Sequence, residues 1–174
     1  ILLIVFLGVS LRVLLSLYGY NVDMEWWRLF ADIKKFNGPI YETGMNYAPP
    51  WAYILHFLDK IPFFLENEIQ SLRYKVMLLL TLGDLAIFFI VLKIHSLKIS
   101  SLFFLNPISI FITGYHSQFD NLAILVGLVS ILLYEKYKKK LGFILFSIFM
   151  GISLTIKHTL IVFPIWIAIK EKKF

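Results

Sequence analysis

Long apolar runs that alternate with short polar segments constrain this chain most. Several of the runs approach the roughly 20 apolar residues that cross a bilayer as one helix. Hydrophobic residues make up 59% of the chain, which is more than a soluble domain of this length can bury. The sequence therefore predicts an all-α, polytopic membrane protein. The expected spans are residues 1–20, 73–92, 99–115, 118–134, 141–157 and 159–170.

The two ends of the chain bear on its organisation. It begins at Ile1 inside one apolar run and stops at Phe174 soon after another. We therefore expect a single transmembrane module, residues 1–174, that belongs to a longer protein. Residues 1–20 are expected to remain as a helix, because no small-residue cleavage site follows them as one follows a signal peptide.

Composition excludes several classes of function. The chain has no cysteine, which removes disulfides, zinc–thiolate sites and thiol nucleophiles. It has no Walker loop, zincin helix or nucleophile elbow, which removes ATP-driven, protease and hydrolase functions. The net charge of +6 does not indicate a nucleic-acid partner, because the lysines gather in short loops between apolar runs.

The placement of these lysines predicts a topology. Residues 93–98, 135–140 and 170–173 are lysine-rich and are expected on the cytoplasmic side. The polar corners at residues 116–121 and 157–158 then face the opposite, outer or lumenal side. The protein is expected in the plasma membrane of a prokaryote, or in the endoplasmic reticulum membrane of a eukaryote.

Residues 21–64 form an outer loop that should not cross the membrane. Within it, residues 23–36 carry apolar side chains at spacings of three and four. This pattern predicts an amphipathic helix with Trp26 and Trp27 at the level of the lipid headgroups. Residues 47–64 have an apolar core too short for a comfortable span and are expected to form a juxtamembrane helix or hairpin.

Five short motifs of polar residues follow one another along the chain. Each of them is weak by itself, and their order is the informative feature. They are Asp23-x-Glu25-x-x-Arg28; residues 46–53, which read Asn-Tyr-Ala-Pro-Pro-Trp-Ala-Tyr; Arg73 with Asp84; Asn106-Pro107 followed by His-Ser-Gln-Phe-Asp-Asn at residues 116–121; and Lys157-His158 followed by Pro164.

In this order the motifs resemble the GT-C superfamily of membrane glycosyltransferases. The closest pattern is that of the dolichyl-phosphate-glucose glucosyltransferases of the asparagine-linked pathway and their prokaryotic relatives. Asn46, Asp120 and His158 depart from the eukaryotic pattern, which fits a bacterial or archaeal relative. The resemblance implies a GT-C-like helical bundle with amphipathic juxtamembrane helices in the first outer loop.

The resemblance also implies an inverting hexosyltransferase that uses a polyprenyl-phosphate sugar donor and a lipid-linked or other glycan acceptor. Asp23 would be the general base. Glu25 would orient Arg28 or bind acceptor hydroxyls, and His116 would contact the donor phosphate or the leaving group. Each has a plainer interpretation: Asp23 as a helix N-cap, Glu25 as a solvated residue, and His116 as an interfacial histidine bonded to the backbone.

A further set of side chains is assigned to substrate binding. Arg28 and Lys157 would bind phosphate, although cations near a membrane surface also contact lipid headgroups. Asp120 also suits the first turn of a helix. No cofactor is required; if a divalent metal takes part, Asp23, Asp120 and His116 are its expected ligands. The set is Arg28, Tyr47, Gln118, Asp120, Asn121, Lys157 and His158.

Arg12 and Asp84 are the charges expected inside the membrane. They lie at similar depths in their apolar runs, and charges at such depth are costly unless they are paired. We expect them to form a structural ion pair. The alternative is an Asp84 that is protonated, or solvated in a cavity.

Two other functions compete with sugar transfer. Arginine and aspartate inside a membrane also occur along the substrate paths of transporters and flippases, but the sequence shows no inverted repeat of the kind many of them have. A non-catalytic scaffold with a GT-C-like fold is the other alternative. A scaffold would tolerate the loss of Asp23, whereas the enzyme would not.

Overall fold

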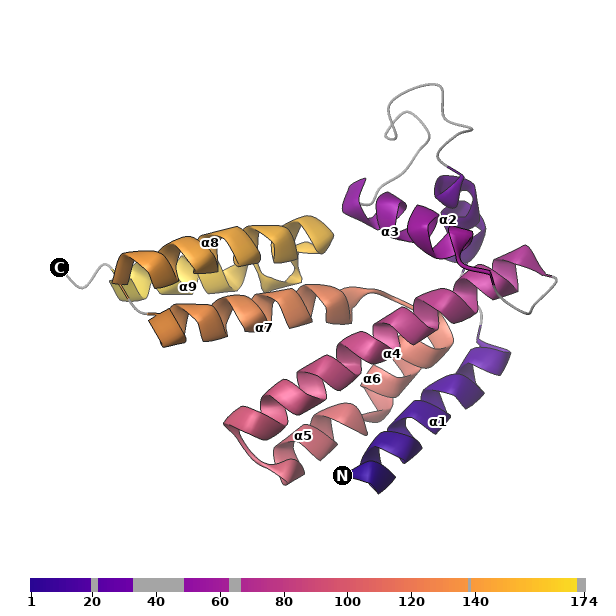
Figure 1. Cartoon of the computed structure of the whole chain (residues 1–174), viewed down its shortest axis with the longest axis horizontal. Coiled ribbons are helices and arrows are strands. Elements are labelled where there is room, and N and C mark those ends of the chain that lie inside the picture. The colour runs from indigo at the N-terminus through magenta and orange to yellow at the C-terminus, as the bar shows by residue number, and fades with distance from the viewer. Residues whose placement is uncertain (20–21, 33–48, 63–66, 138, 172–174) are drawn as a thin grey trace. The chain divides into compact units, whose positions relative to one another are not determined.

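The computed structural model of the chain is helical in the parts that it describes, and no strand occurs there. The all-α expectation is therefore confirmed. The helices pack into two compact units, Ile1–Gln118 and Phe119–Phe174. The described residues are 1–19, 22–32, 49–62, 67–137 and 139–171 (Figure 1).

The first unit is built around one long helix, α4, against which α1, α2, α3 and α5 pack. Helix α4 begins after Asn67, whose side-chain oxygen accepts a hydrogen bond of 3.0 Å from Gln70 N. This bond caps one of the free amides of the first turn. The elements of the unit are α1 (Leu2–Tyr18), α2 (Asp23–Ala31), α3 (Pro49–Lys60), α4 (Glu68–Ile94), α5 (Leu97–Phe104), α6 (Pro107–Phe111) and the π-helical turn η3 (Ile112–His116).

The apolar run at residues 99–115 is a bent pair of helices and not one continuous helix. Helix α5 ends at Phe104, and the axis turns by 42° before the next helix, which starts at Pro107. Proline has no amide hydrogen and disfavours a helical residue before it, so the helix is interrupted. The side chain of Asn106 caps the new helix by accepting a 2.9 Å hydrogen bond from Ile108 N. In a continuous α-helix this amide would donate to the carbonyl oxygen of Phe104.

Arg12 of α1 bonds that carbonyl instead. Its Nη1 donates to Phe104 O at 3.1 Å and to Gly8 O at 3.0 Å. Its Nη2 donates to Ser109 Oγ at 3.0 Å, and both Nε and Nη2 lie 2.9 Å from Asp84 Oδ2. The five N–H groups of the guanidinium therefore all have acceptors.

Arg12 and Asp84 thus form the ion pair that the sequence predicts, and their side chains are 0% and 1% exposed. Asp84 Oδ2 also accepts a hydrogen bond of 2.8 Å from Thr113 Oγ1 in η3. The ring of Phe104 covers the guanidinium, with its centroid 4.5 Å from Cζ. One buried cluster therefore joins α1, α4, α5, α6 and η3.

The packing of α2 on α3 corrects two expectations for the outer loop. Helix α2 ends at Ala31, earlier than the predicted residue 36. Trp27 is 0% exposed and packs edge-on against Trp51 of α3, with ring centroids 5.0 Å apart, whereas Trp26 is 53% exposed. Trp27 therefore lies in the protein core and not among lipid headgroups, because α3 covers that face of α2.

The second unit contains α7 (Asp120–Tyr137), α8 (Lys139–Ile156), the short 3-10 turn η4 (His158–Leu160) and α9 (Val162–Glu171). Helices α7 and α8 lie side by side (Figure 1). Ser153 Oγ donates to Ala123 O at 2.7 Å, and Ser130 Oγ donates to Phe146 O at 3.1 Å. Small hydroxyl residues that let two apolar helices approach closely are typical of helix pairs in membranes.

Among the described residues, α4 is the helix that is long and apolar enough to cross a membrane, and there are up to three spans if each of two bent pairs counts as one. These pairs are α1 with α2, and α5 with α6 and η3. Helices α8 and α9 are apolar but shorter. Helix α3 has 12 residues. At 1.5 Å per residue it measures about 18 Å, less than the roughly 30 Å of a bilayer core. The six-span topology stays a prediction.

Replacement of Asp84 by leucine should lower the free energy of unfolding by about 3–5 kcal/mol, because Arg12 then stays charged and buried without a counter-ion. The double variant Arg12→Met with Asp84→Leu should recover part of this loss, since apolar side chains need no partner. Thermal unfolding in detergent compares the variants. A double variant less stable than Asp84→Leu alone would contradict the pairing.

Replacement of Trp27 by alanine should cost about 3–5 kcal/mol, because it empties a site between α2 and α3. The matched variant Trp26→Ala, one residue away and exposed, should change stability by only about 0.5 kcal/mol. The same unfolding experiment measures both. Equal losses would mean that the two tryptophans share one environment.

Candidate functional site

The backbone after η3 adopts an unusual conformation. The turn Ile112–His116 is wider than an α-helix, and Gln118 N closes it by donating to Ile112 O at 3.1 Å. Ser117 has φ 56°, in the left-handed region that favours glycine, and its side chain is buried. Such strain costs about 1–3 kcal/mol and is concentrated at functional sites. The residues on either side of Ser117, His116 and Gln118, are therefore candidates for the functional site.

The turn directs Gln118 at Asp23. Gln118 Nε2 donates a hydrogen bond of 3.0 Å to Asp23 Oδ2, across 95 residues of sequence. Asp23 is the first residue of α2, and the N-cap is Val22, which makes no side-chain cap bond. Asp23 is therefore not the N-cap that the plainer interpretation expects, although its charge still favours the positive end of the helix.

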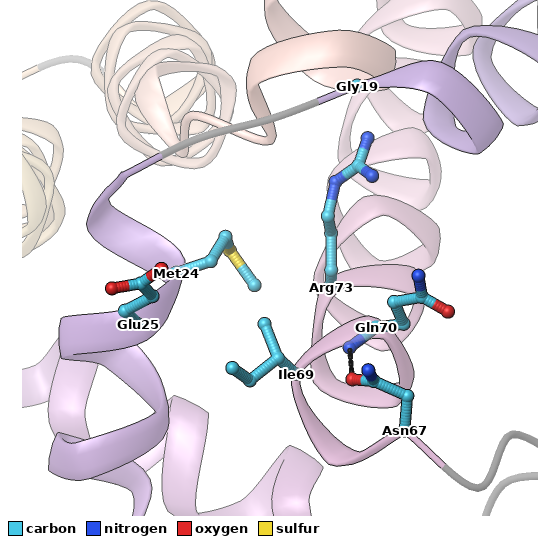
Figure 2. A pocket seen from close by; sticks show the side chains of 7 residues that line it. All are labelled: Gly19, Met24, Glu25, Asn67, Ile69, Gln70 and Arg73. Atoms are coloured by element: carbon cyan, nitrogen blue, oxygen red, sulfur yellow. Dashed lines mark hydrogen bonds between the residues drawn. The ribbon is translucent and has the colours of Figure 1, made fainter.

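A cavity of about 260 Å³ lies between the start of α2 and the first turns of α4 (Figure 2). Two of its lining residues, Met24 and Glu25, directly follow Asp23 in the sequence. Its wall combines apolar side chains with amides, one carboxylate and one guanidinium. The lining residues are Gly19, Met24, Glu25, Asn67, Ile69, Gln70 and Arg73.

Arg73 is the cation of this cavity. Its side chain is 8% exposed, and its Nη2 makes long contacts with Gly114 O (3.5 Å) and Tyr115 O (3.4 Å). Its Nε is buried and has no hydrogen-bond acceptor among the described residues. Gly19 makes room for it, because a Cβ there would overlap with Arg73 Nη2 and with the carbonyl oxygen of Tyr115.

Arg28 does not pair with Glu25, as one interpretation of the first motif expects. Arg28 Nη2 lies 2.7 Å from Glu68 Oε2, and Nη1 lies 3.3 Å from Asp59 Oδ2. Partial burial lowers the pKa of Arg28 more than any other single cause, but the hydrogen bond to Glu68 and the charges of Asp59, Glu68 and Asp32 together raise it. Arg28 therefore ties α2 to α3 and α4; its predicted phosphate contact stays a prediction.

His116 is exposed at the end of η3. Its ring stands edge-on to Phe111 and Tyr115, with centroids 5.0 Å and 5.3 Å away. These contacts position the ring two residues before Gln118.

The remaining predicted binding residues of the described chain belong to the second unit. Lys157 Nζ lies 2.7 Å from Asp120 Oδ2, and it also lies 5.5 Å from the centroid of the Phe119 ring. Asn121 is buried on the next position of α7, and His158 is exposed at the start of η4. Lys157 thus has a carboxylate partner, which is a structural alternative to binding phosphate.

Tyr47 and the predicted metal ligands stay predictions. Tyr47 lies outside the described residues. Within the described ranges, no group of three or more histidine, cysteine, aspartate or glutamate side chains could hold a metal ion. Of the proposed metal ligands, Asp23 and His116 belong to the first unit and Asp120 to the second.

In the sequence, Arg73 stands out only as part of a motif, and Gly19 does not stand out at all. A buried position for Arg73 was signalled by its place at the head of an apolar run. Nothing in the sequence signalled that Gly19 lies against it, because the contact joins residues 54 positions apart.

Comparisons of the chain with known protein families, with curated proteins and with solved structures give no match.

Replacement of Arg28 by glutamine should lower the free energy of unfolding by about 1 kcal/mol at low salt, because Asp59 and Glu68 then face each other without a cation. The loss should shrink at high salt, which screens partly exposed charges. It should also shrink when Glu68→Gln is added. Thermal unfolding at two salt concentrations measures both effects, and an Arg28→Gln variant with unchanged stability would leave Arg28 without this structural role.

Proposed function

We propose that the protein is a GT-C-type glycosyltransferase. It would take a hexose from a polyprenyl-phosphate donor and transfer it, with inversion, to a hydroxyl of a lipid-linked or other glycan acceptor. The observation that carries the proposal is the 3.0 Å hydrogen bond between Gln118 and Asp23. These residues come from the fourth and the first of the motifs that resemble this superfamily.

Asp23 is the general base in this proposal. Its carboxylate takes the proton of the acceptor hydroxyl while the acceptor oxygen bonds to the anomeric carbon of the sugar. The bond between that carbon and the phosphate oxygen breaks, and the polyprenyl phosphate leaves with the electron pair. The amide of Gln118 holds the carboxylate of Asp23 in one orientation, which is what an in-line attack requires.

Neighbouring side chains supply the other roles. Glu25 lines the cavity two residues after Asp23 in α2 and would bind acceptor hydroxyls. His116 is exposed close to Gln118 in the sequence and would contact the leaving phosphate. No metal ion or other cofactor is required by this scheme.

A polyprenyl donor requires a site at a membrane. The length of α4 supports an integral membrane location, and so do large apolar side chains exposed along α1, such as Leu2 (86%) and Phe6 (71%). We propose the six spans of the sequence analysis, with the lysine-rich loops in the cytoplasm and Asp23 on the outer or lumenal face.

Asp23→Asn should lower the rate of sugar transfer by about 100-fold or more, because an amide cannot take up the proton of the acceptor hydroxyl. The protein as encoded by its gene is purified in detergent and given a panel of polyprenyl-phosphate sugars with lipid-linked acceptor extracts. Glu135→Gln, the same chemical change in an exposed residue at the end of α7, is the matched control and should keep full activity.

The outcomes separate the competing functions. Transfer that survives in a folded Asp23→Asn variant would move the base to Glu25 or another carboxylate. No transfer with any donor by the wild-type protein, together with intact lipid binding, would favour a flippase or a scaffold.

A further inference from the structure

We propose that the cavity beside Arg73 binds a phosphate group, either a free phosphate or the phosphate of a lipid, with Arg73 as its counter-ion. The proposal does not depend on sugar transfer, because it rests on the surroundings of one buried cation. It concerns a residue to which the function proposed above assigns no role.

The first argument is the contrast between Arg73 and the other arginines. Arg12 is fully buried and has a carboxylate and a complete set of acceptors, while Arg28 is partly buried between two carboxylates. Arg73 is 8% exposed, yet the described residues offer it no carboxylate and only two long contacts with backbone carbonyls. A buried cation without a counter-ion is costly, so an anion from outside the chain would stabilise it.

The second argument is the space beside it. The cavity measures about 260 Å³, whereas one water occupies about 30 Å³ of the liquid. It therefore has room for a tetrahedral anion together with several waters. Figure 2 shows the guanidinium of Arg73 at one end of the cavity, directed toward Gly19, where the missing Cβ leaves it room.

The third argument is the nature of the other walls. The side-chain amides of Asn67 and Gln70 line the cavity and provide N–H donors in addition to those of Arg73. The first turn of α4 also contributes the positive end of a 27-residue helix. All of these groups belong to α4 or its N-cap, and a phosphate offers their N–H donors more acceptor oxygens than a carboxylate does.

Glu25 is the acidic group on this cavity. Its side chain is exposed, and Figure 2 shows its carboxylate turned away from Arg73. Its charge would weaken anion binding but does not occupy the place beside the guanidinium.

The test is a binding measurement on the protein as encoded, held in lipid nanodiscs. Inorganic phosphate and farnesyl phosphate are the two probes, and acetate is the carboxylate control. The variants are Arg73→Gln, Arg73→Lys and Gly19→Ala. Lys93→Gln removes an exposed charge from the last turn of α4 and is the matched control for net charge.

Arg73→Gln should weaken the binding of the phosphate probe by at least about tenfold, because the charged hydrogen bonds are lost. Arg73→Lys should keep part of the affinity, and Lys93→Gln should keep all of it. Gly19→Ala should weaken binding without loss of charge: its backbone angles (φ −69°, ψ 145°) suit any residue, but the new Cβ would displace Arg73 and also press on the backbone of Tyr115. Preference for farnesyl phosphate would identify a lipid phosphate, and preference for inorganic phosphate a free one.

Stability without ligand gives an independent readout. Since the described residues offer Arg73 no carboxylate, Arg73→Gln removes a costly buried charge, and its thermal midpoint should equal or exceed that of the wild type. The proposal is overturned if neither probe binds the wild type, if acetate binds as well as phosphate, or if Arg73→Gln binds phosphate unchanged. A large drop in the midpoint of Arg73→Gln would also overturn it, because Arg73 would then have its partner within the chain.

Discussion

The buried guanidinium of Arg12 is the group on which the first unit depends. A charge in this position must be neutralised and must also have every N–H group bonded. Asp84 provides the neutralisation, and Gly8, Phe104 and Ser109 provide the remaining acceptors. Because these acceptors belong to different helices, the requirements of one side chain determine how α1, α4, α5 and α6 meet.

The same cluster connects the fold with the candidate site. Thr113 bonds to Asp84 from within η3, and the strained Ser117 follows four residues later. An anchor at one end of this turn lets the other end hold Gln118 against Asp23. The strain is therefore stored near the site, in a turn whose other end the cluster anchors.

The sequence predicts the helices well and the contacts between them unevenly. Apolar runs locate α4, α7 and α8, and the cost of buried charge predicts that Arg12 meets Asp84. Pro107 also signals the break between α5 and α6, which the apolar character of residues 99–115 does not reveal. Periodicity predicts Trp27 at the membrane surface, whereas the structure buries it against Trp51 of another helix. The periodicity of one helix does not reveal a contact with another helix. The bond between Gln118 and Asp23 depends on the left-handed Ser117, and serine carries no signal for that conformation.

The distance in sequence between Arg12 and its partners has a consequence for biosynthesis. Arg12 emerges from the ribosome 72 residues before Asp84 and 97 residues before Ser109. At about 5–20 residues per second, the first of these intervals lasts roughly 4–14 seconds. During this time α1 carries an unpaired charge whose insertion costs about 2.5–3.5 kcal/mol. In a chain that enters the membrane during translation, this cost would last until α4 arrives and Asp84 can pair with Arg12.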